Sequence, residues 1–154
     1  MKMFSAAIMS LVIAGAVSAQ CSALAITGSV NFGQTVGISV TGAPAGSMVF
    51  VAAAQSLGST TFSLGPLGGF SLDIAQPMII LPLGTASAGG SASVSFTMPA
   101  APSGGTIPTV PSQTLHCQSV AIGFPSFGGG GLGGGIPSLG LTFCTSNTTT
   151  LQVF

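Results

Sequence analysis

The segment QTLHCQSVAIG, Gln113 to Gly123, is rich in strand-forming residues, and a second such segment, LGLTFCT, runs from Leu139 to Thr145. Between them lies the glycine run GGGGLGGG, from Gly128 to Gly135. Two strand-like segments that flank a glycine-rich loop predict a β-hairpin. Cys117 and Cys144 lie almost equally far from the centre of that loop. In a regular hairpin they would face each other with Cα atoms about 4.5–5.5 Å apart, which is within disulfide reach.

The N-terminus has the pattern of a secretory signal peptide. Lys2 supplies a positive charge, Ala6 to Val17 is a short apolar run, and Val17-Ser18-Ala19 is a small-residue cleavage site. We therefore expect residues 1–19 to be removed, leaving a single domain, residues 20–154, that begins at Gln20. No later apolar stretch has the length of a membrane-spanning helix. These features predict a protein that is secreted, extracellular or located at the cell surface.

The chain has three cysteines, so a Cys117–Cys144 disulfide would leave Cys21 free or joined to another chain. Pairing of Cys21 with either of the others stays open. Cys21 would also stand next to a new N-terminus, where lipoproteins carry their lipid. Gln20 occupies the place where such sites have Gly, Ala or Ser, so we favour secretion without a lipid.

Charged residues are almost absent, at 1% of the chain, whereas ordinary domains have about 25%. Without Lys2, the conventional ionisable side chains are Asp73 and His116. A chain without cationic side chains cannot neutralise phosphates, which excludes nucleic-acid binding and electrostatic attraction to anionic membranes. It also lacks the charge repulsion that keeps proteins apart in solution.

Short strand patterns separated by Gly and Pro recur along the chain. Thr35 to Thr41 alternates cleanly, and the continuously apolar Ser47 to Ala54 predicts a central strand buried on both faces. Ser91 to Met98 also alternates, and its residues Ala92, Val94, Phe96 and Met98 are expected to face inward. The other candidate strands are Ser22 to Thr27, Thr60 to Leu64, Phe70 to Ala75, Met78 to Leu81 and Asn147 to Phe154.

We therefore predict an all-β fold, an antiparallel, Greek-key-like β-sandwich of about seven to ten short strands with a glycine-rich hairpin loop. The proline-rich segment Pro99 to Pro111 suits a crossover between two sheets. A solenoid is the alternative, but the sequence has no fixed repeat period.

Several motifs together resemble a family of secreted bacterial β-sandwich domains of unknown function, often found at the C-terminal ends of extracellular proteins. The resemblance implies secretion and a sandwich fold, and it implies no activity. The motifs are GAPAGS (Gly42 to Ser47), SLGPLGGFSLDI (Ser63 to Ile74), GGSASVSFTMP (Gly89 to Pro99), LHCQSVAI (Leu115 to Ile122) and SNTTTLQV (Ser146 to Val153).

Few residues offer chemistry. Asp73, His116 and a serine would be needed for a catalytic triad, but no serine has the GxSxG context of a nucleophile elbow. His116 and Cys117 are neighbours on a predicted strand and point to opposite faces, which disfavours a shared metal ion. The run Gly128 to Gly135 lacks the Lys and Ser/Thr of a phosphate-binding loop. Asn147-Thr148-Thr149 matches a glycosylation sequon. We expect no catalytic, metal or cofactor site.

These observations favour a secreted structural or interaction protein that associates with itself, a cell surface or extracellular polymers. The alternative is an extracellular binding module for carbohydrate or another neutral ligand, although the chain has no Trp or Tyr to stack on sugars. A hydrolase is the least favoured class.

Cleavage after Ala19 is a testable prediction. The secreted product should begin at Gln20, which N-terminal sequencing and intact mass can establish. A secreted product that still begins at Met1 would contradict it.

Overall fold

The computed structural model describes residues 20–28, 30–101, 111–124 and 141–153. Within these ranges the chain forms ten strands and one short 3₁₀ helix, which confirms the all-β expectation. The strands are β1 (Gln20–Thr27), β2 (Thr35–Thr41), β3 (Met48–Ala54), β4 (Leu57–Ser63), β5 (Gly69–Ile74), β6 (Met78–Thr85), β7 (Ala92–Thr97), β8 (Gln113–Gly123), β9 (Thr142–Ser146) and β10 (Thr149–Val153), and the helix η1 is Gly65–Leu67.

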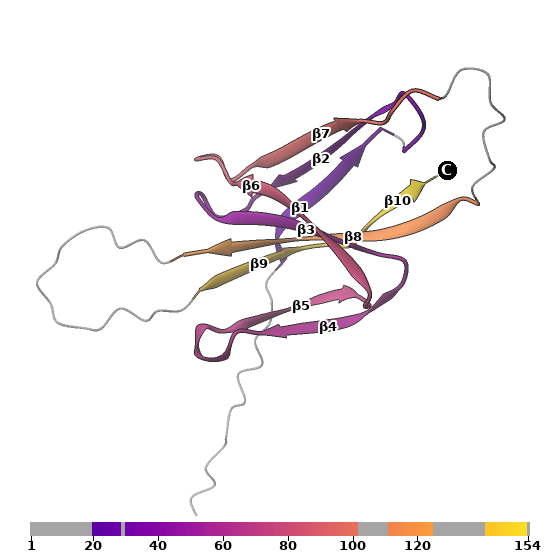
Figure 1. Ribbon diagram of the computed structural model, residues 1–154. Helices are drawn as coiled ribbons and strands as arrows, with labels where there is room; N and C mark the ends of the chain where they lie inside the picture. Colours follow the sequence, from indigo (N-terminus) through magenta and orange to yellow (C-terminus); the bar gives the residue numbers. More distant parts are fainter. Residues whose placement is uncertain (1–19, 29, 102–110, 125–140, 154) are drawn as a thin grey trace, which may run out of the picture.

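The strands form three layers (Figure 1). The large sheet has the order β6-β3-β8-β9-β1-β2-β7, and β10 also pairs with β8. Strands β1, β2 and β7 fold over one face of the part formed by β6, β3, β8 and β9, and the separate β4–β5 hairpin covers the opposite face. One strand pair departs from the expected antiparallel arrangement, since β1 runs parallel to β9.

The middle layer is buried on both sides, as the apolar sequence of β3 predicted. Val49 and Val51 point into the core shared with β1 and β2, whereas Ala52 and Ala54 point into the core beneath the hairpin. Successive side chains of a strand alternate between faces, so a strand with apolar residues at every position fits only between two apolar layers.

Strand β7 has the expected orientation but not the expected burial. Its residues Val94 and Phe96 lie opposite Ile38 and Val36 of β2, on the core side of the sheet. Ala92 is buried, but Val94 and Phe96 are each 39% exposed. The reason is position, since β7 is the last strand of its sheet.

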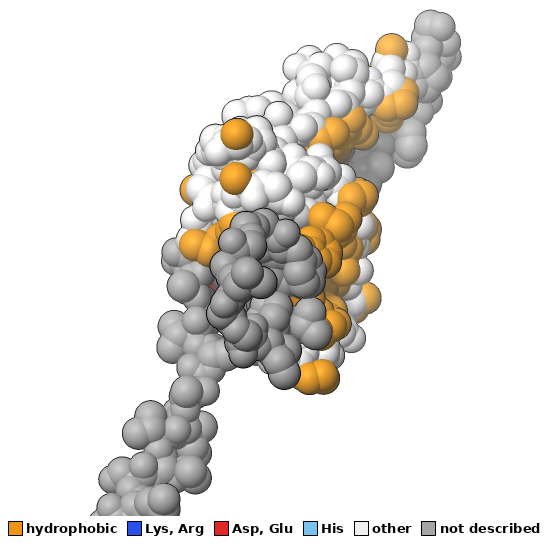
Figure 2. All heavy atoms as spheres, turned by 90° about the vertical axis from the view of Figure 1, so that its left-hand side faces the viewer, with side chains coloured by type: hydrophobic (Ala, Val, Ile, Leu, Met, Phe, Trp, Pro, Cys, Tyr) orange, Lys and Arg blue, Asp and Glu red, His pale blue; other side chains and the backbone are white. Residues whose placement is uncertain are grey.

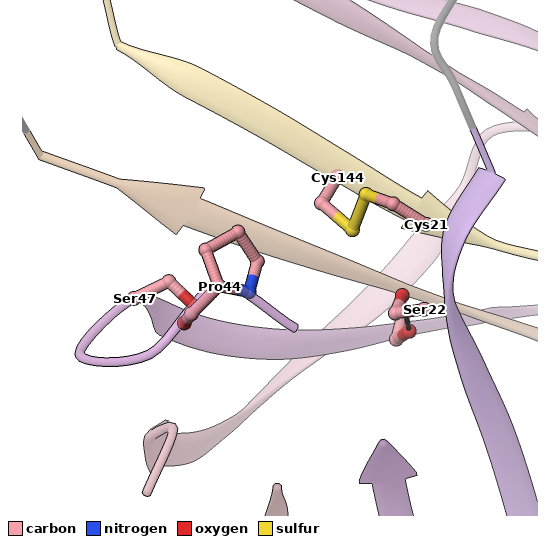
Figure 3. Close-up of a disulfide and its surroundings, with 6 residues drawn as sticks. Cys21, Ser22, Pro44, Ser47 and Cys144 are labelled. Carbon is pink, nitrogen blue, oxygen red and sulfur yellow. Dashed lines mark hydrogen bonds between the residues drawn. A yellow bond between two sulfur atoms is a disulfide. The ribbon is translucent and has the colours of Figure 1, made fainter. Parts of the chain in front are cut away.

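The cysteine pairing also differs from our expectation. Cys144 forms a disulfide with Cys21 (Figure 3), with Cα atoms 5.5 Å apart, and Cys117 is free and buried. In the β8–β9 pairing, Cys144 lies opposite Ala121, so the hairpin is centred two residues later than a Cys117–Cys144 pair would require. Cys117 lies instead between Ala53 of β3 and Thr149 of β10.

Three predicted features lie outside the described residues. They are the signal peptide with its cleavage site at Ala19, the glycine run Gly128 to Gly135, and the central part of the proline-rich crossover.

The Cys21–Cys144 disulfide should contribute strongly to stability. It joins residues 123 positions apart, which corresponds to about 5 kcal/mol in the chain-entropy model. Urea unfolding of Cys144→Ser should show a loss of this order, or no folded protein. The control Cys117→Ala should lose only about 1 kcal/mol.

The disulfide itself can be mapped directly. Residues 20–154 contain no Lys or Arg, so trypsin cannot be used, and pepsin at low pH also suppresses disulfide exchange. A non-reduced peptide that links Cys117 to Cys144 would contradict the pairing.

Candidate functional site

Of the two conventional ionisable side chains, Asp73 contacts the buried amide of Gln118, and no hydrogen bond joins Asp73 to His116. Asp73 is exposed on β5 and His116 is half-buried on β8. Gln118 lies two residues beyond His116, on the same face of β8. Its Oε1 accepts a bond from the Asp73 backbone N–H at 2.7 Å, and its Nε2 lies 3.4 Å from Asp73 Oδ2. The carboxylate therefore faces an amide that fastens the hairpin to the middle layer.

Gln118 is nearly fully buried, and it also connects β8 to β9. Its Nε2 donates a bond to the Ser146 carbonyl oxygen at 2.8 Å. One side chain thus links β5, β8 and the end of β9. A buried amide with satisfied donors and acceptors stabilises a unique packing, and loss of one partner typically costs about 1–3 kcal/mol.

Two further buried residues, Ser119 of β8 and Ser146 of β9, lie on the side of the middle layer away from Gln118. The Ser146 hydroxyl bonds to backbone groups. Ser146 Oγ accepts a bond from the Ser119 N–H at 2.9 Å and donates one to the Asn147 carbonyl at 2.8 Å. The hydroxyls of Ser22 and Ser119 lie 3.4 Å apart. The Ser146 hydroxyl proton is directed at a carbonyl, which is not the geometry of a nucleophile activated by histidine. Within the described ranges, no buried side-chain nitrogen or oxygen lacks a partner.

The remaining predicted residues are dispersed. No group of three or more His, Cys, Asp or Glu side chains occurs in the part of the chain that the structure describes. Cys117 belongs to the core on the side away from Gln118, and its burial raises the pKa of its thiol above the ordinary value. Asn147 of the sequon is exposed between β9 and β10.

On β6 and β7, the strands at the two ends of the sheet order, exposed apolar side chains point toward the core shared with β1 and β2. On β6, Ile79 and Leu81 lie opposite Ala53 and Val51, and they are 65% and 41% exposed. Like the side chains of Val94 and Phe96 on β7, they point toward the core shared with β1 and β2. We call Ile79, Leu81, Val94 and Phe96 the open seam.

The surface of the molecule shows both the exposed apolar side chains and the scarcity of charge. Figure 2 shows hydrophobic side chains gathered along one side of the described surface, and no Lys or Arg on the face that it presents. Sequence reasoning missed the open seam, because alternation predicts which way a side chain points but not whether another layer covers it. It also missed the buried network, whose sequence signal is the polar pair Gln118-Ser119 inside the apolar segment Leu115 to Ile122.

Comparison with known proteins gives no match, whether to a family model, to a curated protein or to a solved structure. Among the described residues, no helix is long and apolar enough to cross a membrane. We therefore base a functional proposal on the open seam.

The buried thiol predicts a loss of stability at alkaline pH. Burial raises the pKa of Cys117 above its ordinary value of 9.0, so the unfolded thiol ionises before the folded one. The free energy of unfolding should be unaffected at neutral pH and should fall as the pH rises through about 9, by at most about 1.4 kcal/mol per pH unit.

Urea unfolding between neutral and alkaline pH measures this slope. The chain has no Tyr, and its one Lys or Arg is Lys2, so few other groups titrate in this range. The slope should disappear in Cys117→Ala, whatever the stability of that variant at neutral pH. An equal slope in the variant would assign the effect to another group.

Proposed function

We propose that the protein is a secreted structural or interaction protein that self-associates through the open seam. The observation that supports this is the exposure of core-facing apolar side chains on both strands that end the large sheet. Signal-peptide features at the N-terminus support secretion, and the resemblance to secreted bacterial sandwich domains agrees with it.

The chemistry of the seam favours a second copy as the partner. Exposed strand edges in soluble proteins usually carry Lys, other charges or Pro, which prevent pairing with a neighbour. Strand β7 has none of these, and among the described strands it pairs with β2 alone. Its other edge therefore presents backbone groups that a neighbouring strand can pair with.

The other terminal strand, β6, is less suited to pairing. Pro82 has no N–H to donate, and the register against β3 shifts between Val49 and Phe50. We therefore place the contact at β7. Two copies of β7 related by a two-fold axis would pair antiparallel, and the pair would bring Val94 and Phe96 of each copy together.

Self-association should depend on concentration and hardly on salt, because there is almost no charge to screen. Sedimentation velocity of the mature chain across concentration and ionic strength tests this. Val94→Lys should shift the protein to monomer, since it places a charge in the apolar contact. Ser59→Lys is the matched control, because it adds the same charge to an exposed position of β4, in the separate two-stranded sheet, and should still associate.

A wild-type monomer at high micromolar concentration would rule out self-association. Equal association of wild type and Val94→Lys would place the contact elsewhere on the molecule.

A further inference from the structure

An apolar pocket of about 250 Å³, open to solvent on one side, lies between the hairpin β4–β5 and the middle layer, and we call it the hairpin pocket. It lies on the face of β3 and β8 away from the open seam. All the residues that line it are apolar, and they include Phe50, Ala52, Phe62, Leu72, Ile80 and Val120.

Contacts at both ends of the hairpin hold it on the sheet. At one end, the Asp73 N–H bonds to Gln118 at 2.7 Å. At the other, the Leu141 N–H donates to the Leu67 carbonyl at 3.3 Å, and the rings of Phe70 and Phe143 lie 5.3 Å apart. The two layers are thus fixed relative to each other at points that flank the pocket, so its walls are preformed.

We infer that the hairpin pocket binds an uncharged hydrocarbon group of about ten carbon atoms. A cavity of roughly 150 Å³ with a similar apolar lining stays dry and binds benzene, so this volume corresponds to a proportionally larger group. A charged ligand would lose its hydration without a partner, because no lining side chain is ionisable or polar. The hydroxyls of a sugar would be left unpaired for the same reason, which excludes carbohydrate from this pocket.

This binding does not depend on the proposed self-association. Ile80 lines the pocket, whereas its neighbours Ile79 and Leu81 belong to the open seam on the other face of β6. The two sites are therefore separable by single substitutions on one strand.

Titration of the mature chain with naphthalene, followed by fluorescence, tests the inference. Naphthalene is an uncharged ten-carbon probe, and the protein contains no Trp or Tyr whose emission would overlap. We expect saturable binding of one naphthalene per chain. Naphthalene-2-sulfonate, which has the same ring system and one negative charge, should bind at least tenfold more weakly.

Three variants locate the binding. Ala52→Leu fills the pocket from its floor and should weaken binding at least tenfold. Ile80→Gln makes the exposed mouth polar and should weaken it severalfold, with little effect on folding because Ile80 is 52% exposed. Ile79→Gln is the matched control in the open seam and should bind naphthalene as wild type does.

Circular dichroism and thermal unfolding establish that each variant is folded, and Ile80→Gln alone decides the question if Ala52→Leu does not fold. Absence of saturable binding to wild type would overturn the inference. So would wild-type affinity in folded Ile80→Gln, or equal affinity for naphthalene and its sulfonate.

Discussion

The pairing of β3 with β8 is the interaction on which the other layers depend. The two strands are in register from Met48 opposite Ile122 to Ala54 opposite His116. Both strands are buried on both faces over most of their length, so they require a layer on each side that excludes water. The β1–β2–β7 layer and the β4–β5 hairpin supply those layers, and each is attached to a different face of the same strand pair.

A chain with so little charge has to satisfy its buried polar groups with amides and hydroxyls. The adjacent residues Gln118 and Ser119 do this on opposite faces of β8. Gln118 bonds to the hairpin at Asp73, whereas the Ser119 backbone bonds to Ser146 of β9. Each neutral hydrogen bond contributes only about 1 kcal/mol, but leaving its buried partner unsatisfied would cost more. The network therefore selects one arrangement of layers without an ion pair.

Local patterns were sufficient to predict the strands, because alternation and apolar runs are properties of short segments. β2 and β8 were predicted with their observed bounds, and the others within a few residues. The hairpin register was not predictable, because glycines impose no side-chain preference that fixes the centre of a turn. As a result the sequence predicted Cys117 as the partner of Cys144, whereas the structure pairs Cys144 with Cys21. Nor does alternation in β7 reveal that Val94 and Phe96 lie at the end of a sheet, since coverage depends on strand order.

The difference between the two terminal strands bears on how assembly would end. If both edges of the large sheet could pair, copies would add at each edge and form an open-ended fibre. Pro82 and the register shift beside it interrupt the ladder on β6, whereas β7 is uninterrupted. If β7 pairs with β7, that contact uses the β7 edge of both copies. Growth through the strands at the two ends of this order would then need the interrupted edge of β6, so the proposed contact would give a closed dimer and not a fibre.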